Sequence, residues 1–202
     1  MGRRTTQIAA LLTCALLAFG SSLAHAAGSP RDIVKRTVED VIAILQNPAL
    51  DSTRRRAMIE EIAQERFDLQ TMSKLVLARN WKRLSDAQKE EYVREFTHYL
   101  ASYYGQRIDR YDQEQLVVLG ERQEPRGDVT VKTQVKGGQF HGVSIDYRMR
   151  EVDGTWLVID VVVEGISLVR NYRDQFTEVM SRSGPESLLK QLREKNASSN
   201  FE

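Results

Sequence analysis

Apolar residues recur with helical spacing from residue 31 to about residue 111. In the segment RDIVKRTVEDVIAILQ they form one stripe at i, i+4, i+7 and i+11, namely Val34, Val38, Val41 and Leu45. The sequence NPALD ends this predicted helix, and Asp51 or Ser52 can cap a second one through TRRRAMIEEIAQERF. A third, shorter helix is expected over DLQTMSKLVLA.

The clearest helix signal begins at Ser85. Gln88 follows three residues later, so the two side chains can form a capping box in which each satisfies the other's backbone N–H. The pattern predicts a helix of about 25 residues, which is long for a helix of a globular protein. Its buried face is aromatic and consists of Tyr92, Phe96, Tyr99, Leu100, Tyr103, Tyr104, Ile108 and Tyr111.

After residue 112 the apolar period changes from 3.6 to 2, which indicates strands. Four segments fit: EQLVVLGERQ, DVTVKTQV, GVSIDYRMR and WLVIDVVV. The turn sequences KGGQFHG and VDGT predict sequential antiparallel pairing. Two further helices are expected over LVRNYRDQFTEVM and PESLLKQLREK, the latter starting with Pro185 after Gly184. The order of elements predicts an α+β fold in which helices cover one face of a curved antiparallel sheet of about four strands.

The N-terminal segment resembles an export signal. Arg3 and Arg4 precede the apolar run IAALLTCALLAFGSSLA, and the small-residue site AHA ends at Ala26. We expect cleavage after Ala26, which assigns residues 1–26 to a signal peptide, 27–195 to a single domain and 196–202 to a disordered tail. The predicted location of the mature protein is the periplasm.

Charge and cysteine content narrow the possible functions. Residues 27–202 carry 27 basic and 28 acidic side chains, a net charge of −1, which argues against a nucleic-acid partner. The single cysteine, Cys14, lies in the signal segment, so disulfide and thiol chemistry are not expected. No metal-site motif or Gly-rich phosphate loop occurs, and we expect no cofactor.

Asp160, within WLVIDVVV, is the strongest candidate for catalysis. A carboxyl group among apolar side chains can act as a general base, but Asp160 can also pair with Arg148 or Arg150 on the neighbouring strand, and we favour the pairing. Glu164 is interpreted as a strand-end acid that accepts hydrogen bonds at the start of the next helix. Ser167 is interpreted as the cap of that helix rather than a nucleophile.

Three separated blocks resemble the periplasmic phospholipid-binding proteins of the Mla (maintenance of lipid asymmetry) system, also called the toluene-tolerance auxiliary-component family. The first is FDLQTMSKLVLARNWKRLSDAQKEEYVREFTHYLASYYGQRIDRY, the second WLVIDVVVEGISLVRNY and the third GPESLLKQLREK. Family members often have Leu-Gly where this chain has Leu77-Ala78, so the local turn there is expected to differ. The resemblance spans about residues 31 to 195.

The resemblance implies an NTF2-like cone that holds the acyl chains of a phospholipid and is not an enzyme. It also implies two docking partners, the substrate-binding subunit of an inner-membrane ABC transporter and an outer-membrane lipoprotein–porin complex. We expect a monomer, with Arg79, Lys82 and Arg83 as docking residues. The competing hypothesis is a small-molecule isomerase or hydratase on the same cone, with Asp160 as its general base.

The expected lipid-binding residues come from three places. The sheet contributes Val131, Ile145, Tyr147, Val161 and Val163; the long helix contributes Phe96, Leu100, Tyr103 and Tyr104; and the covering segments contribute Met72, Leu75, Trp81, Ile166 and Leu168. The two halves of the last strand differ in alternation, and a bulge near Asp160 would turn both toward the interior.

Overall fold

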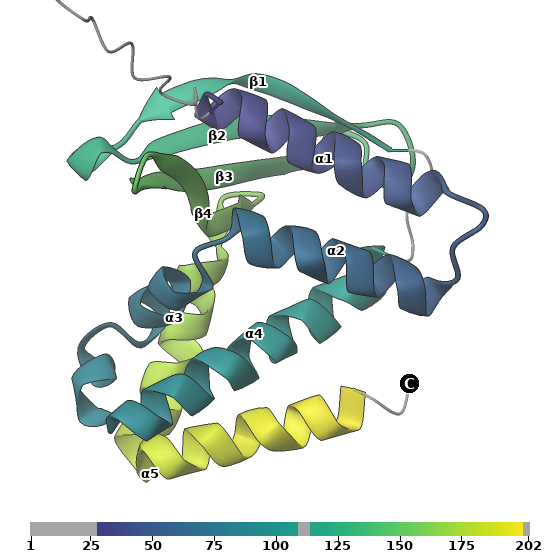
Figure 1. Ribbon diagram of the computed structural model, residues 1–202. Helices are drawn as coiled ribbons and strands as arrows, with labels where there is room; N and C mark the ends of the chain where they lie inside the picture. Colours follow the sequence, from purple (N-terminus) through teal and green to yellow (C-terminus); the bar gives the residue numbers. More distant parts are fainter. Residues whose placement is uncertain (1–27, 109–113, 200–202) are drawn as a thin grey trace, which may run out of the picture.

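The computed structural model describes residues 28–108 and 114–199 (Figure 1). The helices are α1 (Pro30–Gln46), α2 (Ser52–Arg66), α3 (Leu69–Leu77), α4 (Asp86–Ile108) and α5 (Leu168–Ser199), with 3-10 turns η1 (Ala78–Arg83) and η2 (Pro125–Gly127). The strands are β1 (Gln115–Gln123), β2 (Val129–Lys136), β3 (Ser144–Val152), β4 (Thr155–Val163) and β5 (Ile166–Ser167). The predicted α+β class is confirmed. The signal segment, Tyr111 and the last three residues of the tail lie outside the described residues.

The sheet is an antiparallel meander in the order β1-β2-β3-β4-β5. It has five strands rather than about four, because the chain after β4 pairs once more through the two-residue strand β5. The β3–β4 and β4–β5 connections are two-residue turns, Asp153-Gly154 and Glu164-Gly165. All four residues have positive φ, the geometry that matches the twist of a hairpin.

A β-bulge divides β4 into two halves. Arg148 pairs with Asp160 and the next residue, Met149, pairs with Val158, so Ile159 is the extra residue. The bulge restores the facing of the strand: Val158 and Val161 both pack on the same apolar cluster although they differ in parity. The predicted bulge is confirmed.

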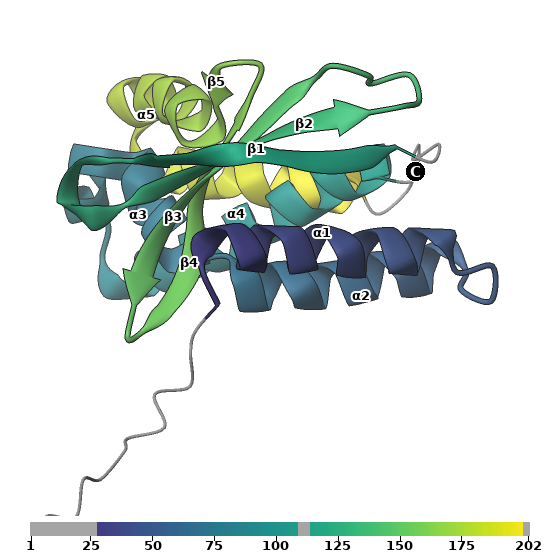
Figure 2. The ribbon, with the colours of Figure 1, turned by 90° about the horizontal axis from the view of Figure 1, so that it is seen from above.

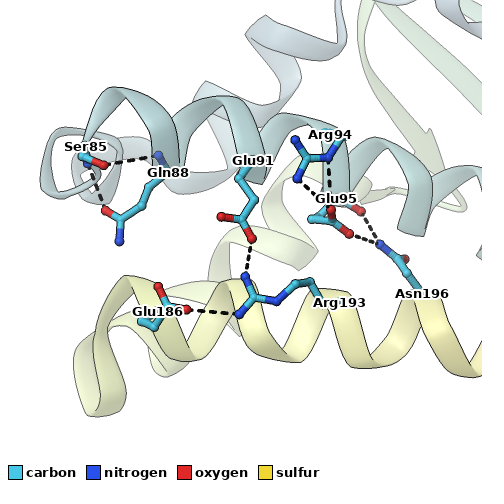
Figure 3. Close-up of polar contacts among 8 residues, drawn as sticks. All are labelled: Ser85, Gln88, Glu91, Arg94, Glu95, Glu186, Arg193 and Asn196. Carbon is cyan, nitrogen blue, oxygen red and sulfur yellow. Dashed lines mark hydrogen bonds and ion pairs between the residues drawn. The ribbon is translucent and has the colours of Figure 1, made fainter.

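The helix boundaries follow their capping residues. The Ser85 N–H donates to Gln88 Oε1 at 3.0 Å and the Gln88 N–H donates to Ser85 Oγ at 3.3 Å, which confirms the capping box (Figure 3). Asp51, not Ser52, caps α2 by accepting from the Arg54 N–H at 2.8 Å.

Helix α5 has two halves that meet at Gly184, where φ is 77° and ψ is −176°. Pro185 starts the second half, as expected. The second half lies alongside α4 (Figures 1 and 3). It continues to Ser199, so residues 196–199 are helical rather than part of the expected disordered tail. Asn196 is buried against α4 and donates to the main-chain oxygen and the carboxylate of Glu95 at 3.0 and 2.9 Å.

The interior contains two apolar clusters rather than one. The sheet cluster joins α1 to the inner sheet face and has buried Ile33, Val34, Val129, Val131, Met149 and Val158. The helical cluster joins α3, η1, α4 and α5 and has buried Val76, Leu77, Leu84, Tyr92, Phe96, Val169, Tyr172, Phe176, Met180, Leu188, Leu189 and Leu192. Figure 1 shows α2 between these two parts, and Figure 2 shows α2 beside α1.

Candidate functional site

A small apolar recess lies between α1 and the inner sheet face. It is lined by Ile33, Val34, Thr37, Val38, Phe67, Tyr147 and Val158, and its free volume is about 10 Å³, roughly the space of one water molecule. Pockets for drug-sized ligands have about 300–1,000 Å³. In this structure the recess therefore has no room for an acyl chain.

Tyr147 gives the recess its one phenol group. Burial raises the pKa of Tyr147 to about 12, so its hydroxyl stays protonated at any physiological pH. The opposite wall comes from Val34 and Val38, which the sequence placed on a helical stripe without assigning them to a site. Phe67 enters because its backbone bridges to Val158 of β4. That long-range pairing left no signal in the local sequence.

Helix α2 borders this region with an apolar face that its neighbours cover only in part. Met58, Ile59 and Ile62 are half-buried, and no residue of α2 is fully buried. Its strongest contacts among the described elements are with α1 and β4. Ile145, Val163 and Leu100, on β3, β4 and α4, are half-buried as well. Apolar surface thus remains incompletely covered along the inner sheet face and its flanking helices.

The helical cluster is built around stacked rings. Phe96 stacks on Tyr92 with centroids 5.6 Å apart and meets Tyr172 and Phe176 edge-on at 5.3 and 5.5 Å. The rings continue from Tyr172 to Tyr99, at 5.8 Å, and from Tyr99 to Tyr103 and Tyr104. Phe96 is only 2% exposed, so in this form its ring contacts the protein core.

Two buried tyrosines in this cluster differ in their hydroxyl environments. Burial raises the pKa of Tyr172, and the nearby hydroxyls of Tyr104 and Tyr99, which hydrogen-bond to it, raise it further. Burial alone raises the pKa of Tyr92, whose hydroxyl has no hydrogen-bond partner within the described part of the chain. The Tyr92 hydroxyl is therefore a buried polar group that lowers stability.

The residues expected to bind lipid are divided between these regions. Val131, Tyr147 and Val161 belong to the sheet cluster, and Leu75, Trp81, Phe96 and Leu100 to the helical cluster. Ile145, Val163, Leu168 and Tyr104 are half-buried, Met72 is buried, Tyr103 is 39% exposed, and Ile166, the first residue of β5, is 63% exposed. The structure thus brings together the sheet residues and, separately, the helical ones.

Asp160 connects β4 to the start of α5. Its carboxylate accepts from the Ser167 hydroxyl at 2.6 Å and from the Val169 N–H at 3.1 Å. The predicted pairing with Arg148 or Arg150 is wrong, because Arg150 forms a two-bond ion pair with Asp128. Asp160 is 2% exposed and points away from the recess. Its position gives no support to a general base inside a cone.

Ser167 has the predicted role, since its hydroxyl oxygen accepts from the Arg170 N–H at 3.0 Å in the first turn of α5. Glu164 does not. Its carboxylate accepts from the Ser144 N–H, and its own N–H donates to the Ser144 carbonyl at 3.0 Å. Glu164 follows the last residue of β4 and lies opposite Ser144, the first residue of β3. It therefore ties the ends of these two strands together instead of contacting α5.

The residues expected to dock on partners, Arg79, Lys82 and Arg83, all lie on η1 and are exposed. Arg83 also donates to Asn80 Oδ1 at 3.0 Å and to the Met180 carbonyl at 3.1 Å, so it holds η1 against α5. Ala78, at the position where the resemblance differs, has φ 48° and ψ −119°, a conformation that favours glycine.

The model of the MlaC protein family matches residues 35–194. The chain belongs to the MlaC family. Toluene tolerance protein ttg2D of Pseudomonas putida is 25% identical over 174 residues, which cover 84% of this chain and 81% of that protein. A phospholipid-binding protein from Ralstonia solanacearum, solved in complex with a phospholipid, has the same fold. Its TM-score is 0.76 at 24% identity, over 84% of this chain and 98% of that chain.

Two absences hold for the part of this MlaC-family protein that the structure describes. No helix there is both long and apolar enough to cross a membrane. No three His, Cys, Asp or Glu side chains gather there in a way that could hold a metal ion.

Proposed function

We propose that this protein is a periplasmic carrier that holds a phospholipid by its acyl chains. The observation that carries the proposal is the incompletely covered apolar surface of Met58, Ile59 and Ile62 on α2, together with that of Val161 and Val163 on β4, which α2 contacts. Membership of the MlaC family supports it, as does a shared fold with a protein solved with a phospholipid. The acyl chains would separate α1 from the inner sheet face and enlarge the recess between them.

The energetics favour hand-over from one protein to another. Each buried CH₂ contributes about 0.8 kcal/mol, so two acyl chains of ordinary length withhold on the order of 20 kcal/mol from water. Release into free solution is then negligible. A carrier with such cargo requires a partner that offers a continuous apolar path. We infer that the partners are an outer-membrane lipoprotein–porin complex and the substrate-binding subunit of an inner-membrane ABC transporter.

Native mass spectrometry after detergent-free purification tests the cargo. A co-purifying diacyl phospholipid is expected, and protein stripped of lipid should reload from vesicles. An Ile59→Asp, Ile62→Asp double variant should load less, because acyl chains would then contact carboxylates, while exposed Glu61→Asp on the same helix serves as the control. A protein that is empty as purified and takes up no lipid from vesicles would refute the carrier function.

The alternative, an isomerase or hydratase with Asp160 as base, predicts a different result. Both oxygens of Asp160 already accept hydrogen bonds from the start of α5. If an Asp160→Asn protein that remains folded still exchanges lipid at the wild-type rate, the catalytic interpretation of this residue is removed.

A further inference from the structure

The stretch from Lys74 to Lys89 concentrates positive charge in a protein that is otherwise acidic. It has five basic residues, Lys74, Arg79, Lys82, Arg83 and Lys89, and one acid, Asp86, for a net charge of +4. Residues 27–202 together carry −1, so the rest of that range carries −5. We call these five basic residues the η1 patch. It gives the molecule one face that an anionic surface attracts and a remainder that it repels.

Most charges of the η1 patch have no acidic partner. Within the described chain, Lys89 pairs with Asp86 at 2.8 Å, while Lys74, Arg79 and Lys82 form no ion pair. The Arg83 guanidinium bonds only to neutral oxygens, those of Asn80 and Met180. Elsewhere some basic residues pair with acids, as Arg150 does with Asp128 at 2.7 Å, while others, such as Arg173, bond to neutral oxygens; the patch differs from them in bringing its unpaired cations together around one turn. The patch therefore keeps a charge that the fold does not use.

An aromatic ring lies at the centre of the patch. The Nζ atoms of Lys74 and Lys89 lie 5.8 and 6.0 Å from the Trp81 ring centroid, within the range of a cation–π contact. Trp81 is half-buried, with its inner edge against Tyr92. A partly exposed indole surrounded by ammonium groups is the combination that favours the boundary between lipid head groups and water.

The η1 patch is also held in place at a cost to the backbone. Ala78, the first residue of η1, has positive φ, a conformation that a residue with a Cβ adopts only when its surroundings enforce it. Two arginines hold the chain in place on either side of Ala78. The Arg173 guanidinium donates to the Leu75 carbonyl at 3.0 and 2.7 Å, and the Arg83 guanidinium donates to the Met180 carbonyl. Backbone strain that is fixed by neighbours marks segments with a role beyond stability.

We propose that the η1 patch docks this protein on an anionic lipid surface. The geometry fits a lipid surface better than an acidic protein, since three of the five cations are lysines, mobile point charges that suit scattered phosphates rather than the two-oxygen fork of a carboxylate. The cations also surround a 3-10 turn with no buried residue, away from the recess between α1 and the sheet. Each cation near such a surface strengthens binding about fivefold, so the contact is weak enough to be transient.

Co-sedimentation with vesicles tests the docking. Purified protein is mixed with vesicles of phosphatidylcholine plus phosphatidylglycerol, or of phosphatidylcholine alone, at low and at physiological salt. Binding is expected only to the anionic vesicles and should weaken with salt, because ions screen exposed charges. The Arg79→Glu, Lys82→Glu variant should lose at least about 25-fold in affinity, about fivefold for each cation removed.

The matched control carries the same change in charge on the sheet side of the molecule. Lys35→Glu on α1 and Lys132→Glu on β2 alter two exposed lysines and should leave vesicle binding within about twofold, since they lie outside the patch. Equal loss in both double variants, or equal binding to neutral and anionic vesicles, would overturn the proposal.

Failure of docking and failure of the carrier function are separable. Protein that carries phospholipid in native mass spectrometry but binds no vesicle would refute the lipid-surface proposal and leave an acidic protein as the partner of the patch. Protein that binds anionic vesicles but never carries lipid would refute the carrier function alone.

Discussion

Asp160 is a buried carboxylate that holds the start of α5 onto the sheet, and its removal is predicted to destabilise the whole fold. Each hydrogen bond to a charged acceptor contributes about 1.5–3 kcal/mol, and Asp160 accepts two, from Ser167 and Val169. Its negative charge near the helix N-terminus adds about 0.3–1 kcal/mol. Because the losses are not additive, Asp160→Ala is expected to cost about 3–4 kcal/mol, and Asp160→Asn, which keeps one acceptor oxygen, about 1–2 kcal/mol.

Urea unfolding followed by circular dichroism measures these changes in the free energy of unfolding. A cycle with Ser167→Ala isolates the Asp160–Ser167 contact, and a coupling of about 1 kcal/mol is expected. Exposed Asp174→Asn, on the same helix, is the control. The reasoning is refuted if Asp160→Asn unfolds within about 0.5 kcal/mol of wild type, the range of an ordinary surface substitution.

Three further predictions concern single side chains. Ala78→Gly should stabilise the protein by about 1 kcal/mol in urea unfolding, because glycine accepts the positive φ at residue 78, whereas Ala43→Gly in α1 should cost about as much. Tyr92→Phe should leave the melting temperature unchanged or raise it. Tyr172→Phe should lower the free energy of unfolding by about 1 kcal/mol, because it removes the hydrogen bonds with the neighbouring tyrosine hydroxyls. Hydrogen bonds from Thr130 and Arg122 lower the pKa of Glu124 from its ordinary 4.5, so its contribution to stability is complete above that value and is lost as pH falls below it. Glu124→Gln should therefore flatten the acid side of a stability–pH profile.

Different outcomes would contradict each of these expectations. A destabilised Ala78→Gly protein would mean that the Ala78 methyl group makes a contact worth more than the strain. Equal losses for Tyr92→Phe and Tyr172→Phe would show that the Tyr92 hydroxyl has a partner in solution. If Glu124→Gln leaves the profile unchanged, other carboxylates govern acid unfolding. Exposed Glu90→Gln provides the comparison for the Glu124 profile.

Local sequence chemistry was sufficient for most of the fold. The Ser85–Gln88 capping box, the Asp153-Gly154 turn and the Gly184-Pro185 junction each act within a few residues, and each appears where its sequence predicts. The β5 strand was missed because two residues carry no alternation pattern. The end of α5 was misjudged because Asn196, polar in sequence, is buried through a contact with Glu95, about 100 residues away in the chain.

The candidate site was less predictable, for a physical reason. Periodicity identifies which side chains are buried but not which partner buries them, so Phe96 and Val131 were assigned to one pocket although they belong to separate clusters. Asp160 was expected to pair across the strand with Arg148, its register neighbour. The carboxylate instead accepts hydrogen bonds from the start of α5. The local sequence does not predict this contact, because it leaves open the direction of the turn that brings the helix back over β4.

The bulge at Ile159 makes the two sides of β4 independent of each other. If Ile159 paired regularly instead of bulging, a strand that faces Trp156 and Val158 inward would also turn Asp160 inward and Val161 outward. Flattening the bulge with every residue kept would therefore place a carboxylate in the apolar interior and detach the start of α5 in one step, whereas deleting Ile159 would restore plain alternation and leave Asp160 facing outward. The bulge thus lets one strand pack Val158 and Val161 on the sheet cluster and anchor a helix from its other side, two roles that strict alternation of this sequence would set against each other.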